Sequence, residues 1–353
     1  MLFGIFDIMQ VLVETSSREA YARHLSDVAL ADRLGLDFYF TAERHFMPHY
    51  RTPSPSVWLG AVAARTRRIR LGALAYVLPL HNPVRLAEEV AMLDHLSNGR
   101  MEVGIGLGHR VEELLSMRID PREREALMME GLVLLVRAWR GERFDHPGQR
   151  YDFADIYVEP PLQRPFPPLW YAGNNPEAAA WAARNGLSLA VGFQPAERLA
   201  APCAAYREAL SAVEAADQQP AAARPPCRLA LMRHLYLAES DERAYDEMAR
   251  DLMRLGDLFA ASPSQVAASE APRRLSRSEA EQQVEQLLRD ETVIGGGPER
   301  VAASIAASAR QLGLDVFLAN PYLTGVESRR VRRTLRLYAE QVRPRARELL
   351  TAA

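Results

Sequence analysis

Two hydrophobic periodicities alternate along this chain. Short apolar runs of the length typical of buried strands are separated by longer stretches in which apolar residues recur every three or four positions, as in amphipathic helices. The apolar runs that predict strands are residues 2–7, 36–41, 69–77, 101–107, 169–172, 187–191, 228–238 and 315–320. Strands that alternate with helices over 353 residues favour a single (β/α)₈ barrel over an open doubly wound sheet.

The stretch from Leu71 to Arg110 is the most informative part of the pattern. Asn82-Pro83 predicts the start of a helix, because the Asn side chain caps free amides and proline at the first position loses no bond. Gly99 predicts its end. The strand that follows has apolar residues on one face and Glu102, Gly104, Gly106 and Gly108 on the other. Glycines on one face of a strand predict close approach by another element or by a ligand.

The whole chain, residues 1–353, is predicted to be one barrel domain with an insertion before the last strand. The tract from Ala260 to Glu279 is small, polar and interrupted by prolines, which predicts a mobile insertion over about residues 258–290. Active sites of such barrels lie at the carboxyl ends of the strands, so the loops that follow the strands are the places to search.

Composition excludes several classes of protein. The formal net charge is only -2, which argues against nucleic acid or an anionic membrane as the main partner. No run is long and apolar enough to span a membrane and no signal peptide is recognisable, so we expect a cytoplasmic protein. All 43 basic residues are arginine, which excludes Schiff-base, pyridoxal-phosphate and P-loop chemistry. The two cysteines and the sparse histidines have no metal-ligand spacing, so we expect no metal.

Two glycine- or asparagine-rich turns are candidate anion sites. Gly173, Asn174 and Asn175 follow a predicted strand and open a helix at Pro176, so its free amides face the end of the barrel. Ordinary helix capping is the alternative. The segment 295–298, Gly-Gly-Gly-Pro, has the same form before the last strand and is the rival phosphate site.

Glu43, Arg44, His45 and His49 cluster after the second strand. A histidine there can serve as a general base or a hydrogen-bond donor, because it titrates near neutral pH. His45 can equally be the structural partner of a carboxylate such as Glu88, within the chain or across a dimer. His81 and His109 flank the same end of the barrel.

Five segments together resemble the bacterial luciferase-like flavin monooxygenases. They are AERHF at 42–46, LPLHNPVRLAEEVAMLDHLSNGR at 78–100, GIGLG at 104–108, YAGNNPEAAAWAARNGL at 171–187 and VIGGGPERV at 293–301. The resemblance implies a barrel that takes reduced FMN from a separate flavin reductase, binds O2 at the flavin C4a position as a peroxyflavin, and oxidises a small organic substrate. It also implies a homodimer built on the helices near 57–65 and 83–96, and a non-proline cis peptide at Leu74-Ala75.

The resemblance assigns roles to particular residues. Ala75, Gly104, Gly106, Gly108 and Gly173 are expected to shape the flavin site, with Asn174 and Asn175 at the phosphate and Arg44 and His45 near the reacting face. Two departures stand out: Arg44 replaces the first histidine of the family's His-His pair, and Leu107 replaces the arginine that contacts the flavin phosphate. These departures keep two alternatives open, a deazaflavin (F420)-dependent oxidoreductase and a non-catalytic flavin-binding dimer partner of the same fold.

Overall fold

The computed structural model describes residues 1–12, 14–163, 166–216, 226–261 and 274–352. Eight parallel strands close into a barrel, as the sequence predicted. In their order around the barrel they are β1 (Leu2–Asp7), β2 (Phe38–Thr41), β3 (Arg70–Val77), β4 (Met101–Gly106), β7 (Leu169–Ala172), β8 (Ser188–Gly192), β9 (Leu229–Leu237) and β11 (Val316–Asn320). β11 pairs with β1, which closes the ring, and each of these strands was predicted.

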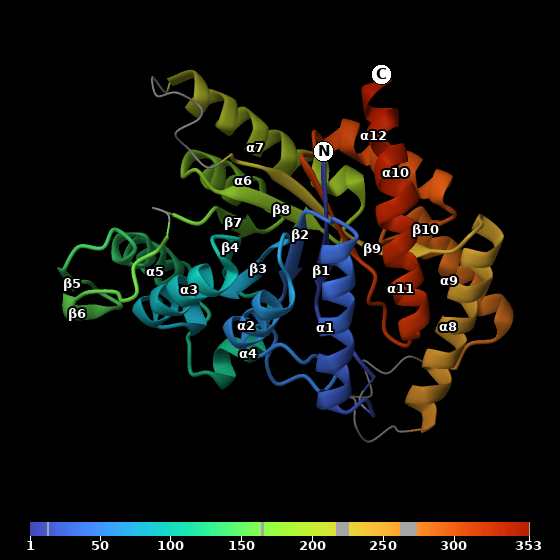
Figure 1. Cartoon of the computed structure of the whole chain (residues 1–353), viewed down its shortest axis with the longest axis horizontal. Helices are drawn as coiled ribbons and strands as arrows, with labels where there is room; N and C mark the ends of the chain where they lie inside the picture. The colour runs from blue at the N-terminus through green and yellow to red at the C-terminus, as the bar shows by residue number, and fades with distance from the viewer. Residues whose placement is uncertain (13, 164–165, 217–225, 262–273, 353) are drawn as a thin grey trace.

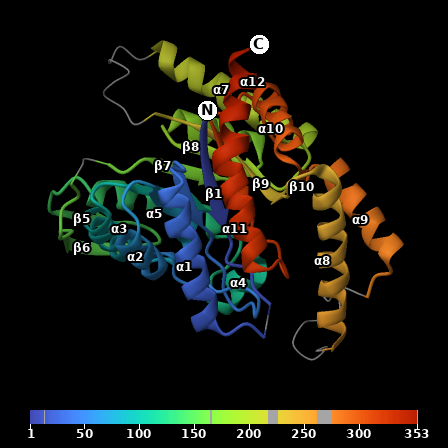
Figure 2. The same cartoon turned by 45° about the vertical axis from the view of Figure 1, so that its right-hand side comes forward.

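The helices surround the barrel in Figures 1 and 2. Those that follow the first four barrel strands are α1 (Ser17–Arg33), α2 (Pro55–Arg65), α3 (Pro83–Ser97), α4 (Val111–Ser116) and α5 (Arg124–Ala138). Those of the second half are α6 (Pro176–Arg184), α7 (Ala196–Ala216), α8 (Asp241–Ala261), α9 (Arg277–Arg289), α10 (Pro298–Leu312), α11 (Ser328–Leu337) and α12 (Arg343–Thr351). Asn82 caps α3 as expected, because its side chain accepts from the amides of Val84 and Arg85.

Two antiparallel strands, β5 (Phe144–Pro147) and β6 (Asp152–Ile156), form the small hairpin that projects beside α5 (Figure 1). A further parallel strand, β10 (Val293–Gly296), lies outside the barrel and pairs with the last residues of β9. We did not predict β10 from the sequence, because a strand of four residues with two glycines carries little apolar pattern. The glycine-rich turn before α10 therefore lies beside the extended end of β9.

The tract predicted to be a mobile insertion, about residues 258–290, is helical over much of its second half. Residues 277–289 form α9, which begins with a capping box between Ser276 and Glu279 and packs on α8. The buried faces of the two helices form a small apolar cluster with Ala244, Met248 and Val284. The rest of the tract, 262–273, lies outside the described residues.

The barrel lumen is filled by large apolar side chains below its carboxyl end. Its cluster includes Phe6, Phe38, Phe40, Leu74, Trp170, Met232 and Leu318. Gly104 belongs to this layer: a Cβ there would lie 2.3 Å from the carbonyl oxygen of Ala73 and 2.7 Å from Leu74 Cδ2. The close approach that the glycine face predicted is thus made, at Gly104, by the neighbouring strand. Beneath it, the buried Glu102 accepts a 2.6 Å hydrogen bond from Trp170 Nε1.

Candidate active site at the carboxyl end of the barrel

The lumen becomes less tightly filled at the carboxyl ends of the strands. Ile8, Ala75, Ala172, Phe193 and His234 are half-buried there, above the fully buried layer of Leu74 and Trp170. The residues on the β3, β4, β7 and β8 side of this end have small side chains or none: Ala75, Gly106, Ala172 and Gly192. The β1, β9 and β11 side has larger ones. The end of the lumen is therefore asymmetric, with small side chains on one side and larger ones on the other.

The predicted flavin-site residues on β3 and β4 meet at this end. The peptide bond between Leu74 and Ala75 is cis, as the resemblance implied. A Cβ on Gly106 would lie 3.2 Å from the Cβ of Ala75, so these two residues face each other. Gly108 has a separate reason to be glycine, because its φ of +74° belongs to the left-handed region.

Glu43 joins the β2, β3 and α3 segments through one buried carboxylate. It accepts from the backbone amide of Val77 at 2.8 Å and contacts His45 Nε2 at 2.8 Å and His81 Nε2 at 2.8 Å. Its side chain is 1% exposed. The carboxylate partner of His45 within the chain is thus Glu43, not Glu88. In this arrangement His45 and His81 contact the same carboxylate.

The pKa shifts of Glu43 and His81 both favour the charged form of the side chain. Burial opposes both charges, yet hydrogen bonds from His45 and His81 hold the pKa of Glu43 below its ordinary value, and the bond to Glu43 raises the pKa of His81. Both groups therefore favour the ion pair in the folded state.

This arrangement predicts a defined pH dependence for the contribution of His81. A raised pKa in the folded state gives stabilisation that is complete below the ordinary value of 6.5 and is lost as pH rises through the raised value. The lowered pKa of Glu43 gives stabilisation that is complete above 4.5 and is lost as pH falls through the lowered value. The difference in unfolding free energy between wild type and His81→Gln should be largest between about pH 4.5 and 6.5. Urea denaturation across pH 4–9 measures it, and a difference independent of pH would contradict the pairing.

Arg44 lies at the rim, apart from this carboxylate. Its Nη1 donates to the backbone carbonyl of Glu43 at 3.0 Å, and its guanidinium stands 6.0 Å from the ring centre of Tyr50. Burial lowers the pKa of Arg44, while nearby Glu113 supports its charge. His109 has a lowered pKa because of burial and then because of Arg44 and Arg110. The rim beside α4 therefore carries basic side chains, and the charge of Arg44 is partly compensated by Glu113.

Both asparagines of the predicted phosphate site are engaged within the chain. Asn174 bridges two strand ends: its Nδ2 donates to the carbonyl of Gly192 at 3.0 Å and its Oδ1 accepts from the amide of the same residue at 3.1 Å. Asn175 caps α6 by accepting from the amides of Glu177 and Ala178. At the rival site, the amide of Gly297 donates to Asp241 Oδ1 at 2.7 Å, so a carboxylate of the chain already lies at the start of α10.

Two residues that the sequence reasoning missed lie at the same end of the lumen. His234 ends the barrel portion of β9, and Asn320 ends β11. His234 Nδ1 and Asn320 Nδ2 are buried and have no hydrogen-bond partner among the described residues. An isolated histidine in an apolar run and an asparagine before a proline give no recognisable signal, so only the register of the strands connects them.

A second buried polar network supports the end of β1. Asp7 accepts from the amide of Met9 at 2.7 Å and from Tyr39 Oη at 3.1 Å, and it contacts His24 Nδ1 at 2.8 Å. Trp58 Nε1 donates in turn to Tyr39 Oη at 2.6 Å. These bonds join α1 and α2 to the first two strands and position the backbone at the mouth of the barrel.

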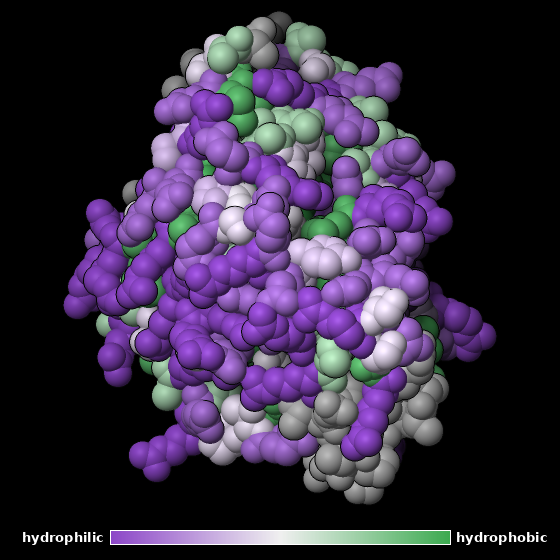
Figure 3. All heavy atoms as spheres, turned by 90° about the vertical axis from the view of Figure 1, so that its right-hand side faces the viewer, coloured by the Kyte–Doolittle hydropathy of each residue, from purple (hydrophilic) through white to green (hydrophobic). Residues whose placement is uncertain are grey.

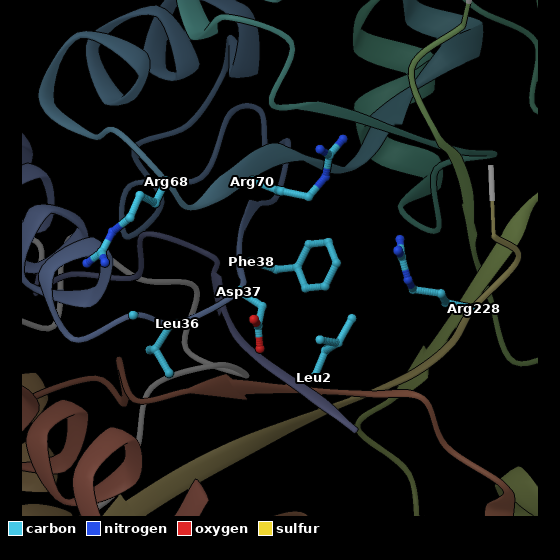
Figure 4. Close-up of a pocket in the computed structure, with 8 residues that line it drawn as sticks. Leu2, Leu36, Asp37, Phe38, Arg68, Arg70 and Arg228 are labelled. Carbon is cyan, nitrogen blue, oxygen red and sulfur yellow. The ribbon is translucent and has the colours of Figure 1, made fainter. Parts of the chain in front are cut away.

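The described residues also form pockets at the edge of this mouth and at the opposite end of the barrel. One, of about 320 Å³, lies between the β1–α1 loop and the start of α11 and is lined in part by Tyr322 and Arg254. The other, of about 310 Å³, opens at the amino ends of the strands. Figure 4 shows Arg70 and Arg228 near the Phe38 ring in this second pocket. Arg70, which lines this pocket, is paired with the buried Glu102.

Taken together, the fold and the carboxyl-end site define a (β/α)₈-barrel protein with an enzyme-like mouth. Among the described residues, no group of three histidine, cysteine or acidic side chains is placed to hold a metal ion. In the same part of the chain, no helix is both long and apolar enough to cross a membrane.

Comparison with known proteins then identifies the family. The family profile described as luciferase-like monooxygenase matches residues 1–316, and the chain belongs to this family. An uncharacterised Sinorhizobium fredii protein is 43% identical over 54% of the chain, and the match spans 56% of that relative. The oxygenase component of flavin-dependent trigonelline monooxygenase from Acinetobacter baylyi is 30% identical over 69% of the chain and 67% of its own length.

Solved structures agree on the fold. Monooxygenase RslO1 from Streptomyces bottropensis superposes with a TM-score of 0.81 at 26% identity, covering 98% of this chain and 99% of that one. The oxygenating constituent of 3,6-diketocamphane monooxygenase from Pseudomonas putida, solved with FMN, gives 0.78 at 19% identity over 98% of each chain. An F420-dependent secondary alcohol dehydrogenase gives 0.71 at 16% identity over 98% of each chain.

Proposed function

We propose that this chain is the oxygenase component of a two-component flavin-dependent monooxygenase. It would take reduced FMN from a separate flavin reductase and use O2 to oxidise a small organic substrate in the cytoplasm. The observation that carries the proposal is the asymmetric mouth, where Ala75, Gly106 and Ala172 present small side chains or none above a floor of Leu74 and Trp170. Family membership supports flavin as the group that binds there.

The residues present fit a flat aromatic group on the β3 and β4 side. Ala75 and Gly106 would line the ring. Gly173 and the start of α6 would lie toward the phosphate, with Asn174 and Asn175 holding the backbone there in place. Bound reduced flavin would supply two electrons, so that one oxygen atom of O2 is reduced to water and the other enters the substrate. The chain would bind and orient both reactants and exclude water.

The rim residues have distinct chemical capacities. An arginine stays charged at neutral pH, so Arg44 would stabilise an anion near the mouth and would not act as a base. His45 is held by Glu43 and would act by positioning the β2 end. His109, whose pKa is lowered, is neutral at neutral pH and can accept a proton there.

The decisive experiment is anaerobic mixing of the protein with reduced FMN, followed by oxygen in a stopped-flow spectrometer. We expect reoxidation of the flavin to show a lag that free reduced FMN lacks. Reoxidation indistinguishable from that of free flavin would reject the proposal in this form.

An F420-dependent oxidoreductase is the second candidate, favoured by the structural match to an enzyme that uses this cofactor. Equilibrium titration with reduced FMN and with F420 separates the two candidates. Preferential binding of F420, without consumption of oxygen, would establish the second. Binding of reduced FMN with no effect on its reoxidation would leave the non-catalytic flavin-binding dimer partner.

The outer faces of α2 and α3 are the proposed homodimer surface. Val57 is 77% exposed, Met92 54% and Leu96 61%. By contrast, the face that carries α8 and α9 is largely hydrophilic (Figure 3). Apolar residues gathered on one exposed surface indicate a protein interface.

We therefore expect Met92→Glu to convert the dimer into a monomer in sedimentation or light-scattering measurements. A carboxylate at the centre of an apolar interface would be desolvated without a partner. Val133→Glu on α5, where the residue is 57% exposed, is the matched control and should leave the mass unchanged. A wild-type monomer at micromolar concentration would contradict the proposed dimer.

A further inference from the structure

The registers of β9 and β11 place His234 and Asn320 side by side on the lumen face. Val316 pairs with Ala230, and Leu318 pairs with Met232. All four side chains belong to the lumen cluster. His234 and Asn320 are the next pair along the same strands, and strand alternation points them into the lumen as well. They lie across the barrel from Ala75 and Gly106, because β9 and β11 are opposite β3 and β4 in the strand order.

Asn320 presents a hydrogen-bond donor whose orientation is fixed. The residue is fully buried, and its Oδ1 accepts from the backbone amide of Tyr322 at 2.9 Å. This bond assigns the oxygen of the amide group, so Nδ2 is the atom left without a partner. A buried donor without a partner is costly and is rarely kept without a reason.

His234 adds a second unpaired nitrogen. Its ring packs against Phe193 with centres 4.9 Å apart, and its Nδ1 is buried without a partner. Burial, and then the charge of Arg233, lower the pKa of His234 to about 4, so the imidazole is neutral at physiological pH. Arg233 is buried as well, and the part of the chain that the structure describes gives it no ion pair. Its charge disfavours a cation beside His234.

The unpaired amide donor of Asn320 and the neutral imidazole of His234 together suit one kind of chemical group. An amide donor beside a neutral imidazole suits an oxygen that accepts one hydrogen bond and either accepts or donates a second. Carbonyl and hydroxyl oxygens have this capacity, and hydrocarbons do not. Ammonium groups have no acceptor and are repelled by Arg233.

We propose that His234 and Asn320 bind an uncharged carbonyl or hydroxyl oxygen of the substrate, opposite the small residues that would face the flavin. This inference rests on the proposed monooxygenase function for its location, and it names the substrate class: small molecules with a ketone, aldehyde or alcohol group. His234 and Asn320 would then determine specificity by orienting the substrate through this oxygen.

The test uses the full chain without flavin. Cyclohexanone and cyclohexanol are titrated into the protein, with methylcyclohexane as a probe of similar shape that lacks the oxygen. Binding is followed by saturation-transfer NMR and by the ¹⁵N shift of the His234 ring, which is assigned with His234→Gln. We expect both oxygen-containing probes to bind and to shift His234 Nδ1, and methylcyclohexane to do neither.

Two substitutions of Asn320 test the donor. Asn320→Asp retains an oxygen for the amide of Tyr322 and removes the Nδ2 donor, and Asn320→Leu removes both groups at similar size. Each should weaken cyclohexanone binding about three- to tenfold, the effect of one neutral hydrogen bond. Asn185→Asp, at the exposed end of α6, is the matched control and should bind as wild type does. If Asn320→Leu does not fold, Asn320→Asp and the His234 shift still decide the question.

Equal binding of all three probes, no binding of either oxygen-containing probe to wild type, or unchanged affinity in Asn320→Asp would overturn the inference. None of these outcomes depends on flavin or oxygen. Failure of the substrate site is therefore distinguishable from failure of the proposed monooxygenase function, which the stopped-flow experiment decides separately.

Discussion

Glu43→Ala is expected to lower the free energy of unfolding by about 3–5 kcal/mol, the cost of breaking a buried ion pair by removing one partner. The substitution removes the acceptor for the amide of Val77 and leaves His45 and His81 without their common carboxylate. Chemical denaturation at pH 6 measures the loss.

Two further variants calibrate this result. Glu43→Gln keeps one oxygen acceptor and loses the charge, so its effect should be smaller than that of alanine. Glu112→Ala removes an exposed carboxylate that stands 3.8 Å from Arg110, and should cost about 0–1 kcal/mol. If Glu43→Ala and Glu112→Ala are equally mild, Glu43 does not hold the β2 and β3 ends together.

Gly106→Val is expected to weaken the binding of reduced FMN about 10- to 100-fold, the range given by overpacking a well-fitted site. The proposed flavin ring would lie over Ala75, and a valine side chain would project toward it from β4, because a Cβ on Gly106 already lies 3.2 Å from the Cβ of Ala75. Anaerobic fluorescence titration measures the affinity, and circular dichroism checks that the barrel is intact.

Gly131→Ala is the control for this substitution. Gly131 lies on α5, where a Cβ would make ordinary contacts of 3.4–3.8 Å with Leu78, outside the lumen. Its flavin affinity should equal that of wild type. Unchanged affinity in Gly106→Val would place the flavin elsewhere, and would refute the assignment of the β3 and β4 side as the cofactor side.

The order of strands and helices could be predicted from local patterns. Alternation identified the strand that includes Gly106, and the Asn82-Pro83 capping signal marked the start of α3. Both depend on residues within a few positions of one another. β10 escaped prediction because four residues with two glycines carry too little pattern, and its pairing with β9 depends on a distant segment.

The candidate site could be predicted only in part. The sequence brought Ala75 and Gly106 to the same end of the barrel, and the structure places them in contact distance. The sequence also predicted that Asn174 and Asn175 bind the phosphate. In the structure, their side chains form hydrogen bonds with the backbone of the chain itself. Whether they approach a bound phosphate stays a prediction.

By itself, the sequence determined the family, the barrel and the strand ends at which chemistry is expected, because periodicity, caps and turn residues act over short distances. Only the tertiary structure decided which side chains meet. His45 pairs with Glu43 and not with Glu88, Glu43 also contacts His81, 38 residues away, and Asp241 lies at the start of α10, 56 residues from Gly297. Likewise, His234 and Asn320 became neighbours through strand register alone. Such choices depend on barrel closure, which fixes the positions of groups that no local pattern relates.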